Sequence, residues 1–208
     1  MAVPARKRAT VQDYLAAQDR APIKLEFVDG QIVTQSGELW EELEARFTEQ
    51  EILGMTGGTY AHAELIERIY QSLLFALHGK PCRPHGSEKR FIDPVFRQNR
   101  YPDAMVTCGP PEFDAGDPHA ITNPSVVFEA LSTSTANIDR GEKAQQYRAT
   151  PSVQAIVFVD SRRRHAESLS RQDDGSWVLR EHAEVIPLPC IDVALKLDDL
   201  YDGVPLDA

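Results

Sequence analysis

The chain has 208 residues, of which 42% are hydrophobic and 26% are charged, and these values are ordinary for a globular domain. No apolar run reaches about 18 residues, and no apolar segment follows the basic residues 6–8. We therefore expect neither a transmembrane helix nor a secretory signal peptide. The 22 Lys and Arg against 32 Asp and Glu give a net charge of −10. This charge counts against a protein that coats nucleic acid through its overall field, so any binding to nucleic acid would need local basic patches or metal ions.

Three cysteines, Cys82, Cys108 and Cys190, are widely spaced and form no CxxC pair. This spacing argues against a structural zinc site made of thiolates. We expect the cysteines to be reduced, buried thiols in a cytoplasmic protein.

The chain begins with a helix and a hairpin. Thr10 and Asp13 have the spacing of a capping box, which predicts a short helix over residues 11–18. Residues 23–33 contain two apolar segments on either side of Asp29-Gly30. Because glycine tolerates positive φ, this dipeptide is a strong hairpin signal, and we expect two short strands here.

Two longer helices are predicted next. Leu39, Leu43 and Phe47 recur at helical spacing, which predicts a helix over residues 38–53. Residues 59–77 carry a second, longer apolar face, and a glycine and a proline beyond residue 77 mark its end.

Strand patterns dominate the second half of the chain. Strands are expected at residues 82–85, 88–92, 101–107, 125–131 and 153–159, with a hairpin over 166–179. Helices are expected at residues 138–149 and 197–201. This order indicates a single α/β domain over residues 1–208, in which helices flank a mixed β-sheet and residues 1–9 form an N-terminal arm.

Two acidic residues interrupt apolar strand segments. Glu129 lies within the almost continuously apolar segment 125–131, where an unpaired charge would cost several kcal/mol. It therefore needs a cation, which is either a basic side chain or a metal ion. Asp103 follows Tyr101-Pro102 and precedes another apolar segment. If the two strands are neighbours, Asp103 and Glu129 could share one Mg²⁺.

Lys143 follows Glu129 on the next predicted helix. Asp139, Lys143 and Tyr147 are spaced to share one helix face. By spacing alone, a surface pair of Asp139 with Lys143 is the simpler interpretation. In the alternative, Lys143 points back towards the carboxylates, where it would stabilise charge on a phosphate or orient an attacking water.

Other polar residues have simpler interpretations. Glu26 alternates with apolar neighbours, as on an edge strand, and His62 opens a long helix, where capping or packing is favoured over metal binding. The cluster 162–165 (Arg-Arg-Arg-His) is a solvated turn by default and a phosphate contact in the alternative. The chain has no HExxH, P-loop, GxSxG or GxGxxG motif, which leaves Ser/His/Asp catalysis without support.

An ordered set of segments resembles the Uma-type family of restriction-endonuclease-like proteins, within the PD-(D/E)XK nuclease superfamily. The resemblance extends over residues 10–201. The matching segments are residues 25–33 (LEFVDGQIV), 55–62 (MTGGTYAH), 101–103 (YPD), 127–132 (VFEALS), 134–135 (ST) and 139–143 (DRGEK).

The resemblance implies a restriction-endonuclease-like core and Mg²⁺-dependent hydrolysis of phosphodiester bonds, with Mn²⁺ as a substitute metal. Asp103 matches the family's PD aspartate and Glu129 its second acid, and both would bind the metal. The usual E-x-K lysine is absent, because Leu131 stands at that position. The resemblance assigns its role to Lys143, and it makes Glu26 an additional acidic residue of the site. His62 matches a recurrent histidine. The expected partners are DNA and a second copy of the chain.

The sequence also departs from the family pattern. Residues 36–54, which include Trp40, resemble an extra helical insertion that could be a lid, an oligomer contact or a DNA-facing helix. Glu88 stands where the family pattern has Asp.

Three other functions stay open at this point. The first is a binding module on a nuclease-like fold, which would bind nucleic acid or a protein without cleaving it. The second is a hydrolase of another class, in which Glu129 and a partner acid transfer protons without a metal. The third is a structural oligomer in which Glu129 is only salt-bridged.

Overall fold

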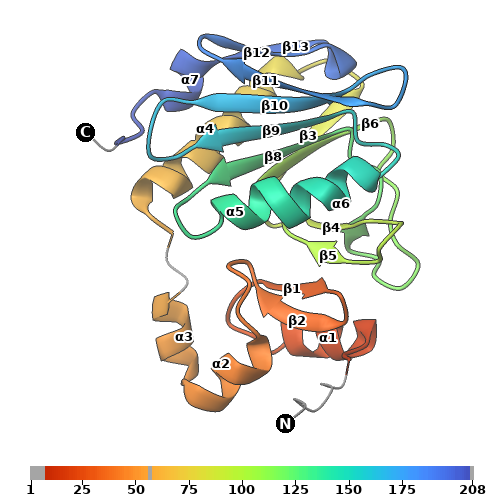
Figure 1. The fold of residues 1–208 in the computed structure, drawn as a ribbon, viewed down its shortest axis with the longest axis vertical. Coiled ribbons are helices and arrows are strands. Elements are labelled where there is room, and N and C mark those ends of the chain that lie inside the picture. Colours follow the sequence, from red (N-terminus) through yellow and green to blue (C-terminus); the bar gives the residue numbers. More distant parts are fainter. Residues whose placement is uncertain (1–7, 56–57, 207–208) are drawn as a thin grey trace.

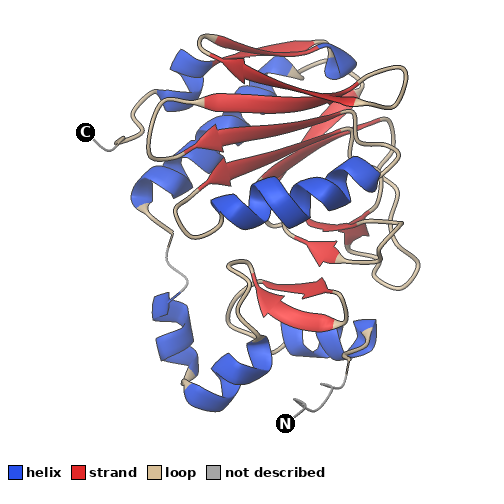
Figure 2. Cartoon of the chain, in the orientation of Figure 1, coloured by secondary structure: helices blue, strands red, loops and turns tan. Residues whose placement is uncertain are grey.

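The structure is a computed structural model, and it describes residues 8–55 and 58–206. Figure 1 shows the elements along the chain, and Figure 2 separates helices from strands. In chain order the elements are α1 (Val11–Gln18), β1 (Leu25–Val28), β2 (Gln31–Thr34), α2 (Trp40–Arg46), α3 (Glu49–Met55), α4 (Tyr60–Ala76), β3 (Cys82–Gly86), β4 (Arg90–Ile92), β5 (Asn99–Arg100), β6 (Ala104–Cys108), β7 (Ala120–Ile121), β8 (Val126–Leu131), α5 (Ala136–Ile138), η1 (Asp139–Lys143), α6 (Ala144–Ala149), β9 (Ala155–Asp160), β10 (Ala166–Arg171), β11 (Trp177–His182), β12 (Val185–Leu188), η2 (Pro189–Ile191), β13 (Val193–Lys196) and α7 (Leu197–Tyr201).

The strands form mixed sheets. A six-stranded sheet has the order β11-β10-β9-β8-β6-β3, and a five-stranded sheet has the order β2-β1-β5-β4-β7. Within them, β8 runs parallel to β9 and β4 runs parallel to β7, while the other neighbours are antiparallel. Strands β12 and β13 form a separate hairpin. Helices flank the six-stranded sheet (Figure 1), so the predicted fold class is confirmed.

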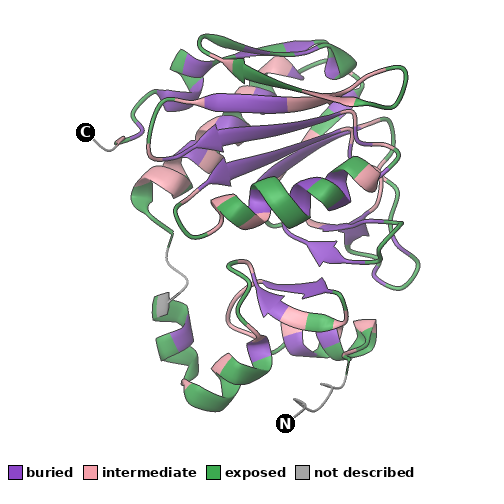
Figure 3. Cartoon of the chain, viewed as in Figure 1, coloured by how far each residue is buried: buried purple, intermediate pink, exposed green. Residues whose placement is uncertain are grey.

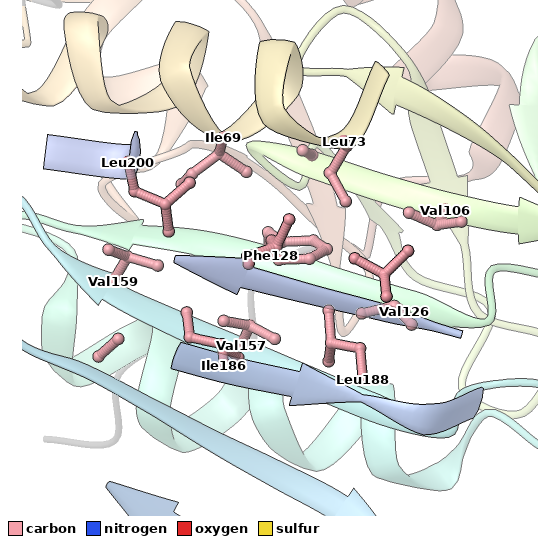
Figure 4. Close-up of a cluster of buried hydrophobic side chains, with 14 of the residues drawn as sticks. Ile69, Leu73, Val106, Val126, Phe128, Val157, Val159, Ile186, Leu188 and Leu200 are labelled. Carbon is pink, nitrogen blue, oxygen red and sulfur yellow. The ribbon is translucent and has the colours of Figure 1, made fainter. Parts of the chain in front are cut away.

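The central strands of the six-stranded sheet, β8 and β9, are buried between layers on its two faces, whereas the edge strand β11 is half-buried to exposed (Figure 3). On one face, Val126 and Phe128 pack in a cluster with Ile69 and Leu73 of α4, which Figure 4 shows. On the other face, Val127 and Leu131 pack against Ala144 and Tyr147 of α6. Alternation along β8 therefore points Glu129 towards the layer formed by α5, η1 and α6.

The predicted N-terminal helix and hairpin are both present. Thr10 caps α1, and the capping box with Asp13 is complete. The hairpin of β1 and β2 turns at Asp29-Gly30, where both residues have positive φ. Tyr14, Phe27 and Trp40 lie in a small apolar cluster beneath the hairpin. The antiparallel pairing of β1 with β5 makes this hairpin part of the five-stranded sheet.

The helix predicted over residues 38–53 is two helices, α2 and α3. The backbone is extended at Phe47, which ends α2, and Thr48 begins the next turn. Of the hydrophobic residues at positions 38–53, only Trp40 and Ile52 are buried. Side-chain spacing alone did not reveal the break, because the apolar periodicity continues through it. In residues 8–55 and 58–206, no helix has the length and apolar character needed to cross a membrane.

The remaining elements follow the predicted order, with three differences. The two-residue strands β5 and β7 lie where no strand was predicted. The hairpin of β12 and β13 was not predicted, since Pro187 interrupts the first strand and both strands are short. The helix predicted over residues 138–149 begins at Ala136, and its residues Asp139–Lys143 form a π-helical turn. Such widened turns frequently occur at functional sites, because they re-aim the side chains of a helix.

The prediction of three reduced, buried thiols is wrong. Cys82 and Cys108 form a disulfide, and Cys190 is exposed. The two bonded residues are direct partners in the antiparallel pair of β3 and β6, which brings their Cα atoms to 4.0 Å. The sequence did not indicate this disulfide, because the number of cysteines is odd and the two bonded residues are 26 positions apart.

Candidate functional site

Glu129 is buried and makes two polar contacts within the helical layer. Its side chain is 1% exposed. Tyr147 on α6 donates its hydroxyl to Glu129 Oε1 at 2.5 Å, and Lys143 Nζ lies 3.3 Å from Oε2. The carboxylate predicted to need a cation therefore has a lysine beside it.

Lys143 lies at the end of the π-helical turn η1 and is as buried as its partners. Its Nζ lies 2.9 Å from Asp139 Oδ1, four residues earlier, as well as 3.3 Å from Glu129. Both contacts considered from the sequence therefore exist together. The pair with Asp139 is not on the surface, however, since the Asp139 and Lys143 side chains are 2% and 4% exposed.

Asp103 lies just before β6, at the end of the sheet where Glu129 lies on β8. Its Oδ2 accepts the backbone N–H of Ala130 at 2.7 Å. The register of β6 with β8 pairs Ala104 with Phe128, so the next opposing positions are Asp103 and Glu129. The two acids thus come from adjacent strands, as the sequence required for a shared ion.

The charges of this cluster do not balance. Burial raises the pKa of Glu129 well above its ordinary value, although the Lys143 ammonium acts to lower it. Burial likewise raises the pKa of Asp103, against the attraction of His62 and Lys143. Burial lowers the pKa of Lys143, but the surrounding carboxylates, Glu129 first, outweigh this and the net shift is upwards. One ammonium therefore serves more carboxyl groups than it can neutralise.

Asp103 and Glu129 are the residues that could hold a divalent cation. Across residues 8–55 and 58–206, no group of three or more His, Cys, Asp or Glu side chains is arranged to hold a metal. A cation here would rest on two carboxylates, with water or substrate oxygens completing its shell, which is the arrangement that Mg²⁺ prefers. The excess of negative charge fits such an ion.

Glu26, the fourth candidate residue, lies in a neighbouring ion pair. It is fully buried on β1, and Arg100 Nη1 lies 2.6 Å from its Oε2. Arg100 also donates from Nε to Gln146 at 2.9 Å and from Nη2 to Glu142 at 2.5 Å. Glu142 and Gln146 flank Lys143 on the helix. Glu26 therefore connects to the cluster through Arg100.

His62 is in the first turn of α4, which Thr59 caps. Its Nε2 lies 2.8 Å from the carbonyl oxygen of Ala130 and 4.0 Å from Asp103 Oδ2. The predicted packing role agrees with these contacts, and they also place the imidazole beside the carboxylate cluster.

The Arg-rich turn follows β9, next to the end of β8. The buried Asp160 accepts from the backbone and guanidinium of Arg162 and pairs with Arg163. Arg164 pairs with the exposed Asp198. Acidic neighbours thus balance much of the charge of this turn, in agreement with the default interpretation.

Sequence reasoning missed two contributors to this site. Tyr147 was placed on the right helix face, but its hydrogen bond to Glu129 was not foreseen. Arg100 was not singled out, because it stands in a polar segment whose two-residue strand has no apolar pattern. Helical spacing from Lys143 could have found the tyrosine, whereas nothing local marks the arginine.

A family model described as "Putative restriction endonuclease", Uma2, matches residues 38–198. The chain belongs to the Uma2 family. The matched region contains the helices α2 and α3, which the sequence suggested to be an insertion, as well as Asp103, Glu129 and Lys143. Glu26 lies before it.

Two similar proteins of Synechocystis extend the match towards the N-terminus. The uncharacterized protein sll1609 is 28% identical over 181 residues, which cover 87% of this Uma2 chain and 91% of that protein. The uncharacterized protein slr1290 is 30% identical over 198 residues, with coverages of 93% and 91%. Both span nearly the whole chain.

A solved structure has the same fold. It is the crystal structure of a "putative nuclease" from Anabaena variabilis, with a TM-score of 0.65 and 12% sequence identity. The match covers 94% of this chain and 99% of that one. The likeness supports the mixed α/β fold of this Uma2 protein over most of its length.

Proposed function

We propose that this Uma2 protein is a Mg²⁺-dependent endonuclease that hydrolyses phosphodiester bonds of nucleic acid, with DNA as its substrate. The observation that carries the proposal is the convergence of Asp103, Glu129 and Lys143, from two adjacent strands and a helix. Membership of a family described as "Putative restriction endonuclease" agrees with it.

In this mechanism, Asp103 and Glu129 would hold one Mg²⁺. The bound ion would acidify a water and withdraw charge from a phosphate oxygen. Asp103 supplies a carboxylate that the Ala130 N–H orients, and Tyr147 orients that of Glu129. Lys143 orients the nucleophilic water, or its fixed positive charge stabilises the charge that develops on the phosphate. The burial of all these groups strengthens each electrostatic contact.

Glu26 has a supporting role in this proposal. Its buried pair with Arg100 fixes the guanidinium that also bonds Glu142 and Gln146. Arg100 thereby holds the helix turn from which Lys143 projects. The proposal also retains two predictions from the sequence, a cytoplasmic protein and a homodimer.

Metal binding is the first test. Mn²⁺, a substitute for Mg²⁺, is titrated calorimetrically into wild type, Asp103→Ala and Glu129→Gln, with Asp198→Asn as an exposed carboxylate control. We expect one site in the wild type and the control and none in the other two variants. Binding that persists in Asp103→Ala and Glu129→Gln would remove the carboxylate pair from the proposal.

Cleavage is the second test. Supercoiled plasmid, single-stranded DNA and RNA are incubated with Mg²⁺, with Mn²⁺ or with EDTA. We expect metal-dependent nicking of plasmid that Asp103→Ala and Lys143→Met abolish and that Lys89→Met, an exposed lysine variant, retains. Wild-type rates in both site variants would refute the assignment, and cleavage in EDTA would favour metal-free proton transfer instead.

One observation favours a second candidate, the non-catalytic binding module. Both carboxylate oxygens of Glu129 are already engaged, by Tyr147 and Lys143. A protein that uses this cluster only to hold its fold together would bind nucleic acid equally well in EDTA and would cleave nothing. Absence of cleavage in the second assay, together with nucleic acid bound equally well in EDTA and in Mg²⁺, would favour this candidate over the nuclease.

A further inference from the structure

The edge of β8 beside Glu129 is completed by side chains instead of a strand. Strand β6 pairs with β8 from Val106 opposite Val126 to Ala104 opposite Phe128, where the ladder ends. Ala130 is the next residue of β8 that presents its backbone groups to this side, and it is fully buried. Its N–H donates to Asp103 Oδ2 at 2.7 Å, and its carbonyl accepts from His62 Nε2 at 2.8 Å.

We infer that His62 is a positioning residue for Asp103, an inference that rests on the proposed function. The imidazole holds the carbonyl of Ala130 while the N–H of the same residue holds the carboxylate. Both contacts fix one short stretch of backbone at the point where the regular ladder stops. Loss of either leaves a buried polar group of Ala130 unpaired, which is unfavourable, so the stretch would shift.

The contact with Ala130 indicates which ring nitrogen of His62 carries a hydrogen. A carbonyl oxygen only accepts, so Nε2 of His62 carries the hydrogen. The same nitrogen lies 4.0 Å from Asp103 Oδ2, where its polar hydrogen attracts the carboxylate. His62 thus acts on Asp103 in two ways, by direct attraction and through the backbone of Ala130.

The position of His62 is well anchored. Its backbone N–H donates to the capping hydroxyl of Thr59 at 3.2 Å. Helix α4 then packs Leu65 and Ile69, both fully buried, against the face of the sheet. The imidazole therefore reaches β8 from a rigid helix. Partners that orient metal ligands in this way typically change metal affinity by about 10–100-fold when they are removed.

The test uses three variants of the full chain. His62→Leu removes the donor to Ala130, whereas His62→Gln keeps an N–H donor where Nε2 lies. His182→Leu removes a histidine that bonds Ser168 on a distant strand pair, at 2.8 Å, and serves as the matched control. Each variant is measured by Mn²⁺ calorimetry, by amide hydrogen exchange resolved at Ala130, and by thermal unfolding.

We expect His62→Leu to weaken Mn²⁺ binding by about tenfold and to speed exchange at Ala130 relative to Phe128. His62→Gln should restore most of both, and His182→Leu should change neither. A role in folding alone would lower the melting temperature of His62→Leu without changing Mn²⁺ affinity in the folded protein, and that result would overturn the inference.

The exchange measurement separates this inference from the proposed function. If the wild type binds no Mn²⁺, the metal-dependent nuclease fails, and His62 loses its role in a metal site. Unchanged exchange at Ala130 in His62→Leu, in a wild type that does bind Mn²⁺, overturns the positioning of Asp103 alone.

Discussion

Lys143 and Glu129 form a buried ion pair although they are fourteen positions apart in the sequence. An E-x-K arrangement would place the lysine two residues after the acid on the same strand. Here that position is Leu131, which is fully buried in the apolar layer beneath α6. The lysine instead reaches the acid from the π-helical turn η1, which also brings Asp139 to within 2.9 Å of it. A cation can thus occupy the same region from a different element.

Replacing Lys143 tests how much this pair stabilises the fold. Lys143→Met leaves Glu129 and Asp139 buried without their cation, and we expect a loss of about 3 kcal/mol in the free energy of unfolding. Urea unfolding without metal measures it. Lys89→Met, an exposed lysine, should stay within about 0.5 kcal/mol of wild type. Adding Glu129→Gln to Lys143→Met should restore part of the loss, and a further loss would contradict the pairing.

The pH dependence of stability should carry the signature of Glu129. Burial raises the pKa of Glu129 above its ordinary value of 4.5. As pH rises above that value, Glu129 ionises in the unfolded chain while it still holds its proton in the folded protein. The folded state then binds more protons, so the free energy of unfolding falls as pH rises towards the raised pKa.

The measurement is a series of urea unfolding curves in EDTA from about pH 4.5 upwards, where this window begins. Glu129→Gln cannot ionise and should flatten the decline. Glu181→Gln, on an exposed strand position, should keep the wild-type slope. A decline of equal steepness in Glu129→Gln would mean that other groups cause it.

The second buried pair should be as important to stability as the first. Arg100→Met leaves the buried Glu26 without its cation, with only the Tyr101 N–H donating to it, and also removes the donors to Glu142 and Gln146. We therefore expect a loss of about 3–5 kcal/mol. Arg164→Met breaks a pair with the largely exposed Asp198 and should cost less than about 1 kcal/mol. Equal losses of unfolding free energy in the two variants would show that the buried Arg100 pair stabilises the fold no more than an exposed pair does.

Glu26 should contribute to stability and Asp103 to cleavage. Asp103→Ala is expected to fold and to lose cleavage, because Asp103 is a metal ligand in the proposal. Glu26→Gln keeps the shape of Glu26 and an acceptor for Arg100. We therefore expect it to retain measurable cleavage with reduced stability. Complete loss of cleavage in folded Glu26→Gln would return Glu26 to the catalytic set.

Local patterns were sufficient for most of the fold. The capping box at Thr10, the turn at Asp29 and the apolar segment around Glu129 each correspond to the expected element. In each case the signal lies within a few residues of the element, so one sequence contains it. The break at Phe47 was missed because it depends on a backbone angle that apolar spacing does not report.

The candidate site was only partly accessible in this way. Glu129 stood out because a charge within an apolar strand needs a partner. Its actual partners, Lys143 and Tyr147, come from a helix whose placement depends on packing across the whole layer. Spacing alone favoured a surface position for Lys143, and the resemblance to a family reversed that preference. The pairing of Arg100 with Glu26 joins positions 74 residues apart, and no local pattern indicates it.

The disulfide offers a test that is independent of the candidate site. Cys82 and Cys108 close a loop of 26 residues on adjacent strands, and cross-linking a loop of this size typically contributes about 3 kcal/mol. We expect Cys82→Ser and Cys108→Ser to lower the free energy of unfolding by that amount. Cys190→Ser should have little effect, since Cys190 is an exposed free thiol.

Alkylation of the native protein, followed by mass spectrometry, tests whether the bond is present. It should label Cys190 alone before reduction and all three cysteines after reduction and unfolding. Because Cys108 ends the strand that begins directly after Asp103, reduction that also weakened Mn²⁺ binding would show that this bond supports the site as well as the fold. Labelling of all three thiols without reductant would mean that the bond is absent.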